Sequence, residues 1–222
     1  NGNGSTVPYG CFQTLGDLWI DFGKNSAYKN YYRDLDLMKG IASVSYEQDR
    51  IQFKREIFAS YPAKALIVRL TASTSKAISF SLELNRPERF DTKVVNNGLV
   101  MSGMMNDGRG GEGMRYKVMV VPVVRGGKLL ADNNKLIVKK ATEVMLVITS
   151  STDYRLQYPD YKKSDFEEEP VRISDEAVRK GFAELRREHI SDFSGYMNRV
   201  SLKLGKQEQS VPTDLLLQKN KE

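Results

Sequence analysis

The chain has 222 residues, a length that suits one large domain with an appendage. Its 34 Lys and Arg outnumber its 28 Asp and Glu, for a net charge of +6, but both signs are mixed along the chain without a long basic run. This pattern favours a solvated surface over a nucleic-acid interface, and no apolar run approaches the ~18 residues that a membrane-spanning helix needs. We therefore expect neither nucleic acid nor a membrane as a partner.

The first two thirds of the chain predict one β-strand after another. Apolar and polar side chains alternate most clearly over residues 51–60, whereas residues 115–124 and 142–150 are nearly continuous apolar runs, typical of strands buried on both faces. With a turn signal every ten residues or so, the pattern indicates a mainly β fold, a large antiparallel β-sandwich over residues 1–151. The other predicted strands are residues 15–22, 28–37, 42–46, 66–72, 78–84, 99–102 and 135–140.

Residues 152–173 are predicted to form a surface loop, because Pro, aromatic and acidic residues are mixed there without a period. A helical linker follows over residues 174–222. Ser174 is a suitable N-cap for its first helix, Gly181 predicts a break, and Gly205 is expected to end the ordered pattern.

The apolar stripe of this linker is wide, and one flank of a sandwich is too small to bury all of it. We therefore expect part of the stripe to stay exposed and to contact another domain. Pro212 begins a further helical pattern. The stripe consists of Val178, Phe182, Leu185, Phe193, Tyr196, Met197 and Val200.

Motifs that carry chemistry are scarce. The glycine-rich segment 107–113 precedes a predicted strand rather than a helix, so we favour a flexible hairpin over a phosphate-binding loop. His189, the only histidine, lies in the helical pattern, where packing or a hydrogen bond is favoured over general-base catalysis. Cys11, the only cysteine, excludes an intrachain disulfide and a cysteine-based zinc site.

Acidic and sulfur-containing residues give no clearer signal. Carboxylate pairs such as Asp34/Asp36 and Glu83/Glu88 arise readily in a chain with 28 acids, and strand spacing cannot place two carboxyls across one bond. A group of methionines is interpreted as core residues rather than a metal site. We assign no catalytic, cofactor-binding or metal-binding residue, and we expect no cofactor. The methionines are Met101, Met104, Met105, Met114 and Met119.

Four ordered blocks together resemble one protein family. They are Phe12–Phe22; Tyr32–Leu37 with Val44–Tyr46; Arg55–Pro62 with Val68–Ala72; and His189–Phe193 with Asn198–Leu202, Leu204-Gly205 and Pro212–Asp214. These blocks resemble the N-terminal region of glycoside hydrolase family 95, whose best-known members are inverting α-L-fucosidases. The resemblance implies a β-sandwich of the super-sandwich type and a helical linker ahead of an (α/α)6-barrel catalytic domain. The catalytic residues of such proteins lie in that barrel, so none is assigned to this chain.

From the resemblance we expect a non-catalytic domain that packs against its own catalytic barrel, supports it and is inactive alone. The parent protein is expected to be secreted or periplasmic. The family has further strands ahead of the first block, so we also expect an open sheet edge here. Residues 1–9, or a second copy of the chain in a truncation-induced dimer, would cover that edge, or a strand there would be locally disordered.

Two other functions remain open. The first is a carbohydrate-binding module, with Trp19 or the group of Tyr28, Tyr31 and Tyr32 as a stacking platform for a sugar. The second is a protein-interaction domain that uses the exposed helix face. Because aromatic side chains are mostly buried, we favour packing of these four residues in the core or between the sheets over sugar binding.

Overall fold

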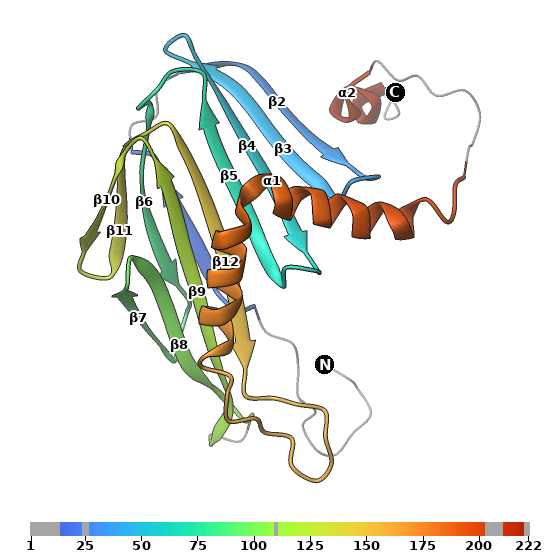
Figure 1. The fold of residues 1–222 in the computed structure, drawn as a ribbon. Helices are drawn as coiled ribbons and strands as arrows, with labels where there is room; N and C mark the ends of the chain where they lie inside the picture. Colours follow the sequence, from blue (N-terminus) through green and yellow to red (C-terminus); the bar gives the residue numbers. More distant parts are fainter. Residues whose placement is uncertain (1–13, 24–26, 109–110, 203–210, 220–222) are drawn as a thin grey trace.

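The computed structural model describes residues 14–23, 27–108, 111–202 and 211–219, and it shows two packed antiparallel sheets and a long helix (Figure 1). The strand order is β1-β6-β11-β10 in the smaller sheet and β2-β3-β4-β5-β12-β9-β8-β7 in the larger one. The strands are β1 (Asp17–Asp21), β2 (Tyr28–Asp36), β3 (Ile41–Gln48), β4 (Ile51–Ser60), β5 (Ala65–Ala72), β6 (Ile78–Asn85), β7 (Phe90–Val95), β8 (Gly98–Asn106), β9 (Glu112–Arg125), β10 (Lys128–Asp132), β11 (Lys135–Ala141) and β12 (Glu143–Thr152).

The predicted mainly β fold is therefore confirmed, and each predicted strand is present. The hairpin of β3 and β4 turns at Asp49 and Arg50, which both have positive φ (52° and 64°). Such a turn matches the right-handed twist of the paired strands. Sequence patterning missed only the short strands β7 and β10, whose alternation is too brief to stand out.

The main core fills the space between the two sheets. Leu82 and Leu136 of the smaller sheet are buried there with Val120 and Leu146 of the larger one. Strand β12 lies in the middle of the larger sheet, and its alternate residues contribute to two separate cores. Because both faces of β12 are buried, its sequence is nearly continuously apolar, and the predicted burial on both faces is confirmed.

Helix α1 (Glu169–Met197) covers the outer face of the larger sheet, as Figure 1 shows. It begins five residues before the predicted start at Ser174, because Pro170 lies in the first turn, where a missing N–H costs nothing. Ser174 is instead buried inside the helix. The helix ends at Met197, before Val200, the last residue of the predicted apolar stripe.

A second helix, α2 (Thr213–Lys219), confirms the helical pattern predicted from Pro212. The expected end of the ordered pattern at Gly205 falls outside the described residues. The division into residues 1–151, 152–173 and 174–222 stays a prediction of domain organisation. In the described part of the chain, neither helix combines the length and the apolar composition needed to cross a bilayer.

Gly181 divides α1 into two arms, as predicted. Its φ of 73° and ψ of 169° are not helical, and Figure 1 shows the helix bending sharply along its course. This backbone conformation is open to glycine and strained for other residues. The first arm runs along β12, and the bend redirects the second arm toward the turn between β2 and β3.

Strand β1 is the last strand of the smaller sheet, so its outer side forms a sheet edge among the described residues. The predicted pairing of residues 1–9 with such an edge falls on residues that the structure does not describe. In the larger sheet, β2 is an edge strand, and nearly all its side chains are exposed. Eight strands face four, so the larger sheet extends beyond the smaller one.

Candidate functional site

The first arm of α1 is fixed to β12 by buried hydroxyl groups. The Thr149 hydroxyl donates to the carbonyl oxygen of Pro170 (3.0 Å) and lies 2.9 Å from the Ser174 hydroxyl, and both side chains are fully enclosed. Ala177 packs in the same layer as Met145 and Val147 of β12. Because buried polar groups must keep their hydrogen-bond partners, these bonds fix the position of the helix along β12.

The second arm is fixed by His189, which is only 2% exposed. Its ring stacks on Phe58 of β4, with centroids 4.7 Å apart, and its Nε2 lies 3.1 Å from the carbonyl oxygen of Gly40. A carbonyl only accepts, so Nε2 carries the proton and donates it. The predicted packing and hydrogen-bonding role of His189 is confirmed.

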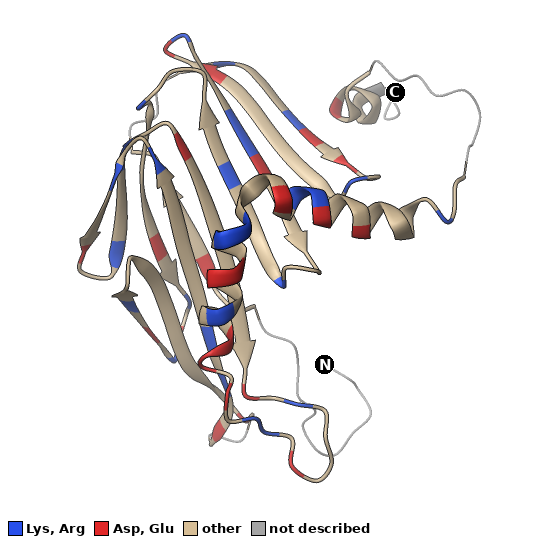
Figure 2. Cartoon of the chain, in the orientation of Figure 1, with Lys and Arg blue, Asp and Glu red and all other residues tan. Residues whose placement is uncertain are grey.

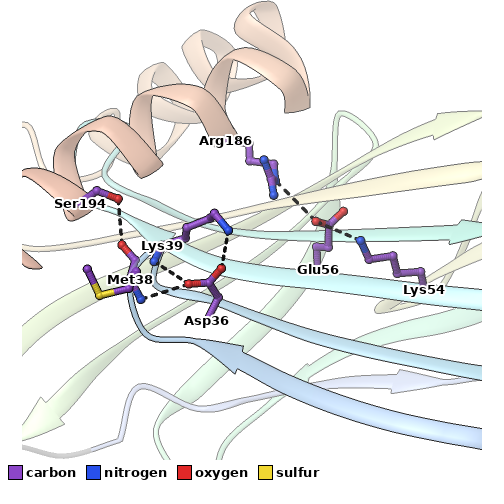
Figure 3. A network of polar contacts seen from close by, with 7 residues as sticks. All are labelled: Asp36, Met38, Lys39, Lys54, Glu56, Arg186 and Ser194. Carbon is purple, nitrogen blue, oxygen red and sulfur yellow. Dashed lines mark hydrogen bonds and ion pairs between the residues drawn. The ribbon is translucent and has the colours of Figure 1, made fainter. Parts of the chain in front are cut away.

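The turn between β2 and β3 fits closely against this arm. A Cβ atom added at Gly40 would lie 2.9 Å from the ring of Phe193, and the φ of Gly40 is +62°, so both space and backbone require glycine. The Ser194 hydroxyl donates to the carbonyl oxygen of Met38 (2.8 Å), as Figure 3 shows. The helix thus contacts the sheet from its centre to its outermost strands.

A charged cluster also joins α1 to the larger sheet. The buried carboxylate of Glu56 on β4 is within 3.5 Å of Arg186 Nε on α1 and 3.4 Å of Lys54 Nζ (Figure 3). Arg69 approaches the same carboxylate at 3.8 Å and donates two hydrogen bonds to Glu143. Three cations surround this one carboxylate, and their attraction offsets the desolvation cost of burying its charge beneath the helix.

Asp36 closes the β2–β3 turn. Its carboxylate accepts from the backbone N–H of Met38 (3.1 Å) and of Lys39 (3.0 Å) and from the Lys39 ammonium (2.6 Å) (Figure 3). The Lys39 side chain is the largest cause that lowers the pKa of Asp36 below its usual range. The turn that receives the helix is therefore held by an ionised side chain.

The apolar stripe of α1 is buried only in part. Leu185 is completely enclosed, and Phe182 and Val178 pack against the core beneath the helix. Toward the end of the helix the stripe leaves the sheet, where Tyr196 and Met197 are exposed and Val200 is 83% exposed. The expectation of an uncovered apolar helix face is confirmed.

The expected burial of the aromatic residues of β1 and β2 is wrong. Trp19 is 62% exposed on the outer face of the smaller sheet, because its neighbours Leu18 and Ile20 point into the core and a strand alternates its faces. Tyr28 is equally exposed, and Tyr31 and Tyr32 are more than half exposed, since all three lie on the last strand of the larger sheet.

Tyr28 and Tyr31 form part of a row of rings. Tyr28 lies 5.5 Å from Tyr31 and 6.4 Å from Tyr46, which stacks on Phe53 at 5.3 Å. Phe53 in turn packs against the main core. The guanidinium of Arg55 lies over the ring of Tyr46 at 5.3 Å and donates to its hydroxyl. The row leads from the core to an exposed aromatic surface, which can stack on a planar or sugar ligand.

The remaining candidates identify no catalytic centre. Strand β9 begins at Glu112, within the glycine-rich segment 107–113, and pairs antiparallel with β8, so the predicted hairpin is confirmed. Met101 and Met119 are core residues as predicted, but Met114 is exposed. In the described ranges, no three His, Cys, Asp or Glu side chains gather closely enough to hold a metal ion.

One member of each acidic pair considered from the sequence, Asp36 and Glu83, forms a surface ion pair with a lysine. Asp36 contacts Lys39, and Glu83 contacts Lys135 at 2.6 Å across the smaller sheet, a hydrogen bond that raises the pKa of Lys135. Figure 2 shows that positive and negative residues are interspersed along α1 and the sheets. Such exposed pairs contribute little to stability and do not form a desolvated active site.

Comparison with known proteins agrees with the fold and the sequence blocks. The chain is 29% identical over 209 residues to "Probable alpha-fucosidase A" of Aspergillus niger, a match that covers 88% of the chain and 26% of that protein. It is 26% identical over 226 residues to "Alpha-L-fucosidase 2" of Arabidopsis thaliana, covering 90% of the chain and 27% of the relative. The chain thus spans about a quarter of the length of these relatives.

A solved structure, "Putative kojibiose phosphorylase from human microbiome", superimposes with a TM-score of 0.50 at 13% identity, over 75% of this chain and 25% of that one. This similarity concerns the fold alone. Residues 1–157 match the family described as "Glycosyl hydrolase family 65, N-terminal domain". That match takes in all twelve strands and stops short of α1. The chain belongs to this family of glycosyl hydrolase N-terminal domains.

Proposed function

We propose that the chain is the non-catalytic N-terminal domain of a family 95 glycoside hydrolase similar to α-L-fucosidases. In this role it packs against the catalytic barrel of the whole protein through α1 and supports it. The main observation in favour is the helix itself, whose first arm is fixed to the sheet while its end presents apolar side chains to solvent. An exposed apolar stripe on a rigidly held helix suits a permanent contact between domains.

The length of the relatives supports the same proposal. Proteins named α-fucosidases align with nearly the whole chain but are three to four times longer, so most of each relative lies outside the alignment. By resemblance to the family, the whole protein is secreted or periplasmic and the carboxyl groups of catalysis belong to the barrel. The acidic residues described here serve ion pairs and turns instead.

An activity assay tests this proposal. The isolated chain is expected to show no hydrolysis of aryl α-L-fucosides or aryl galactosides, whereas the whole protein proposed above, with its catalytic barrel, is expected to be active. Turnover by the isolated chain that a single Asp or Glu substitution within it abolishes would contradict the supporting role.

We keep a carbohydrate-binding module as the second candidate, because Trp19 and Tyr28 are exposed and therefore accessible to a sugar. Trp19 lies opposite Glu83, which pairs with Lys135, and Tyr28 lies with Tyr31 at the exposed end of the row of rings. Aromatic faces of this kind stack on sugar rings.

Calorimetric titration with fucose, galactose and their oligosaccharides separates the two candidates, since a carbohydrate-binding module binds with an affinity that Trp19→Ala or Tyr28→Ala reduces. A pure support gives no heat of binding.

A further inference from the structure

A pocket of about 550 Å³ lies at one end of the smaller sheet, formed by the loop between β5 and β6, the turn between β9 and β10, and the end of β11. Its described lining includes no residue of α1 and none of the exposed aromatic residues. Four lysines provide most of its lining, together with Ser79 and the turn glycines. The lysines are Lys76, Lys128, Lys139 and Lys140.

The backbone of the pocket is held by hydrogen bonds. The N–H of Lys140 donates to the Ser79 hydroxyl (2.9 Å), and the N–H of Lys76 donates to the Thr142 hydroxyl (3.1 Å). Both lysines have positive φ (53° and 61°), and the pairing of β11 with β6 shifts register just before Ala141. The irregular end of β11 thus brings two consecutive lysines to one opening.

The glycine turn closes the other side. A Cβ atom at Gly127 would lie 2.6 Å from the carbonyl oxygen of Lys139 and 2.7 Å from the backbone of Ala141. Only a residue without a side chain lets the turn pass this close to β11. Lys128, the next residue, therefore enters the pocket directly opposite Lys139, its partner in the ladder.

The positive charge of this pocket is uncompensated. None of its four lysines forms an ion pair with an acidic residue in the described part of the chain, although Lys135 on the same strand pairs with Glu83. The Ser79 hydroxyl already accepts from Lys140, so its own proton is free to be donated. The side chains around the pocket therefore offer donors and positive charge, which is the complement of an anion.

We propose that this pocket binds a tetrahedral oxyanion, sulfate or phosphate, carried as an ester on a sugar-sized ligand. Ammonium groups act as compact point charges that tolerate the many orientations of a tetrahedral anion. The alkyl stems of the lysines supply apolar walls, and the volume falls within the range of small-molecule sites. None of the described residues that line the pocket is aromatic, so they provide no stacking platform for the bases of a nucleic acid.

The test is a titration of the 15N-labelled chain followed by amide chemical shifts. The ligands are sodium sulfate, sodium phosphate, glucose 6-sulfate and glucose 6-phosphate, with sodium chloride at matched ionic strength and neutral glucose as references. Saturable shifts at Lys76, Gly127 and Lys140 are expected with the oxyanions and not with the references. Tighter binding of the esters than of the free anions would support a sugar ester, and the sulfate and phosphate arms distinguish the two anions.

Charge-neutral variants make the test specific. Lys128→Gln with Lys139→Gln is expected to weaken oxyanion binding at least about tenfold. Lys29→Gln with Lys64→Gln removes the same charge from exposed positions elsewhere and is expected to leave binding within about twofold. Shifts that follow ionic strength alone, or an equal loss in both double variants, would overturn the proposal. Each single variant repeats the comparison if a double variant proves unstable.

Discussion

Side chains of different chemistry hold α1 to the sheet. Leu185 fills the core under the helix, His189 joins a ring of β4 to a carbonyl of the β2–β3 turn, and Glu56 neutralises cations from both elements. Apolar contacts supply most of the energy in such an interface, whereas the polar contacts determine its geometry. Single substitutions can separate the two contributions.

Leu185→Ala tests the apolar contribution. The side chain is fully enclosed between α1 and the larger sheet, so its truncation is expected to lower the free energy of unfolding by about 2–5 kcal/mol. Leu202→Ala makes the same chemical change where the side chain is 79% exposed, and it is expected to cost less than about 0.5 kcal/mol. Urea denaturation of both variants measures the difference, and equal costs would show that α1 does not pack as described.

Asp36→Asn tests the ionised turn. The Lys39 side chain lowers the pKa of Asp36 in the folded protein, so its contribution is present above the unfolded pKa and is lost as pH falls through the folded value. The stability difference between the native chain and the variant is therefore expected to shrink between about pH 5 and pH 2. Thermal unfolding across that range measures it, and a difference that stays constant would contradict the ionic role of Asp36.

At the scale of elements, the sequence predicted the strands well because their patterns are local. The alternation of β4 and the two-faced apolar run of β12 both follow from the layers that contact each strand. The start of α1 was misplaced because Ser174 fits the N-cap preference, while the helix accepts Pro170 one turn earlier. The predicted packing and hydrogen bond of His189 are confirmed, but no local sequence signal indicates that Gly40 is its hydrogen-bond partner.

The two glycines of α1 provide a test of the bend. Gly181→Ala meets no atom within 4 Å, yet it forces a side chain into a conformation that only glycine adopts easily, so we expect a loss of about 1–3 kcal/mol. Gly195→Ala also has open space around it but keeps helical dihedral angles, and it is expected to gain about 0.5–1 kcal/mol. Denaturation midpoints of the pair measure this, and similar effects at both positions would argue for a straight helix.

At the scale of the whole molecule, the unequal widths of the sheets explain what sequence patterning missed. The exposure of Tyr28 and of its neighbours on β2 depends on which strand ends the larger sheet and on how far the two sheets overlap. Neither property is written in the residues of β2, since strand order results from contacts between distant segments. The aromatic surface and the lysine pocket both depend on such long-range placement, so they appear only in the folded chain.

The edge at β1 leads to a prediction for the isolated chain. Unpaired backbone groups of an edge strand template pairing with another chain, so we expect dimerisation that increases with concentration. Trp19→Lys places a charge on this strand and is expected to favour the monomer, whereas Tyr61→Lys, at an exposed turn between β4 and β5, is expected to leave the dimer intact. Light scattering at several concentrations measures the mass. A monomer at every concentration would show that β1 does not pair with a second copy.

The attachment of α1 to the β2–β3 turn has a consequence for deuterium uptake. The Gly40 N–H donates to the carbonyl oxygen of Asp36 (2.7 Å), and the Gly40 carbonyl accepts from His189 on the helix. Exchange at this amide therefore reports whether the second arm is docked, while amides in the centre of the sheet at β12 report global unfolding. A domain that packs on the exposed end of α1 would slow exchange at Gly40 without altering β12. Exchange at Gly40 therefore measures the docking of the second arm and would report the packing of the proposed catalytic domain.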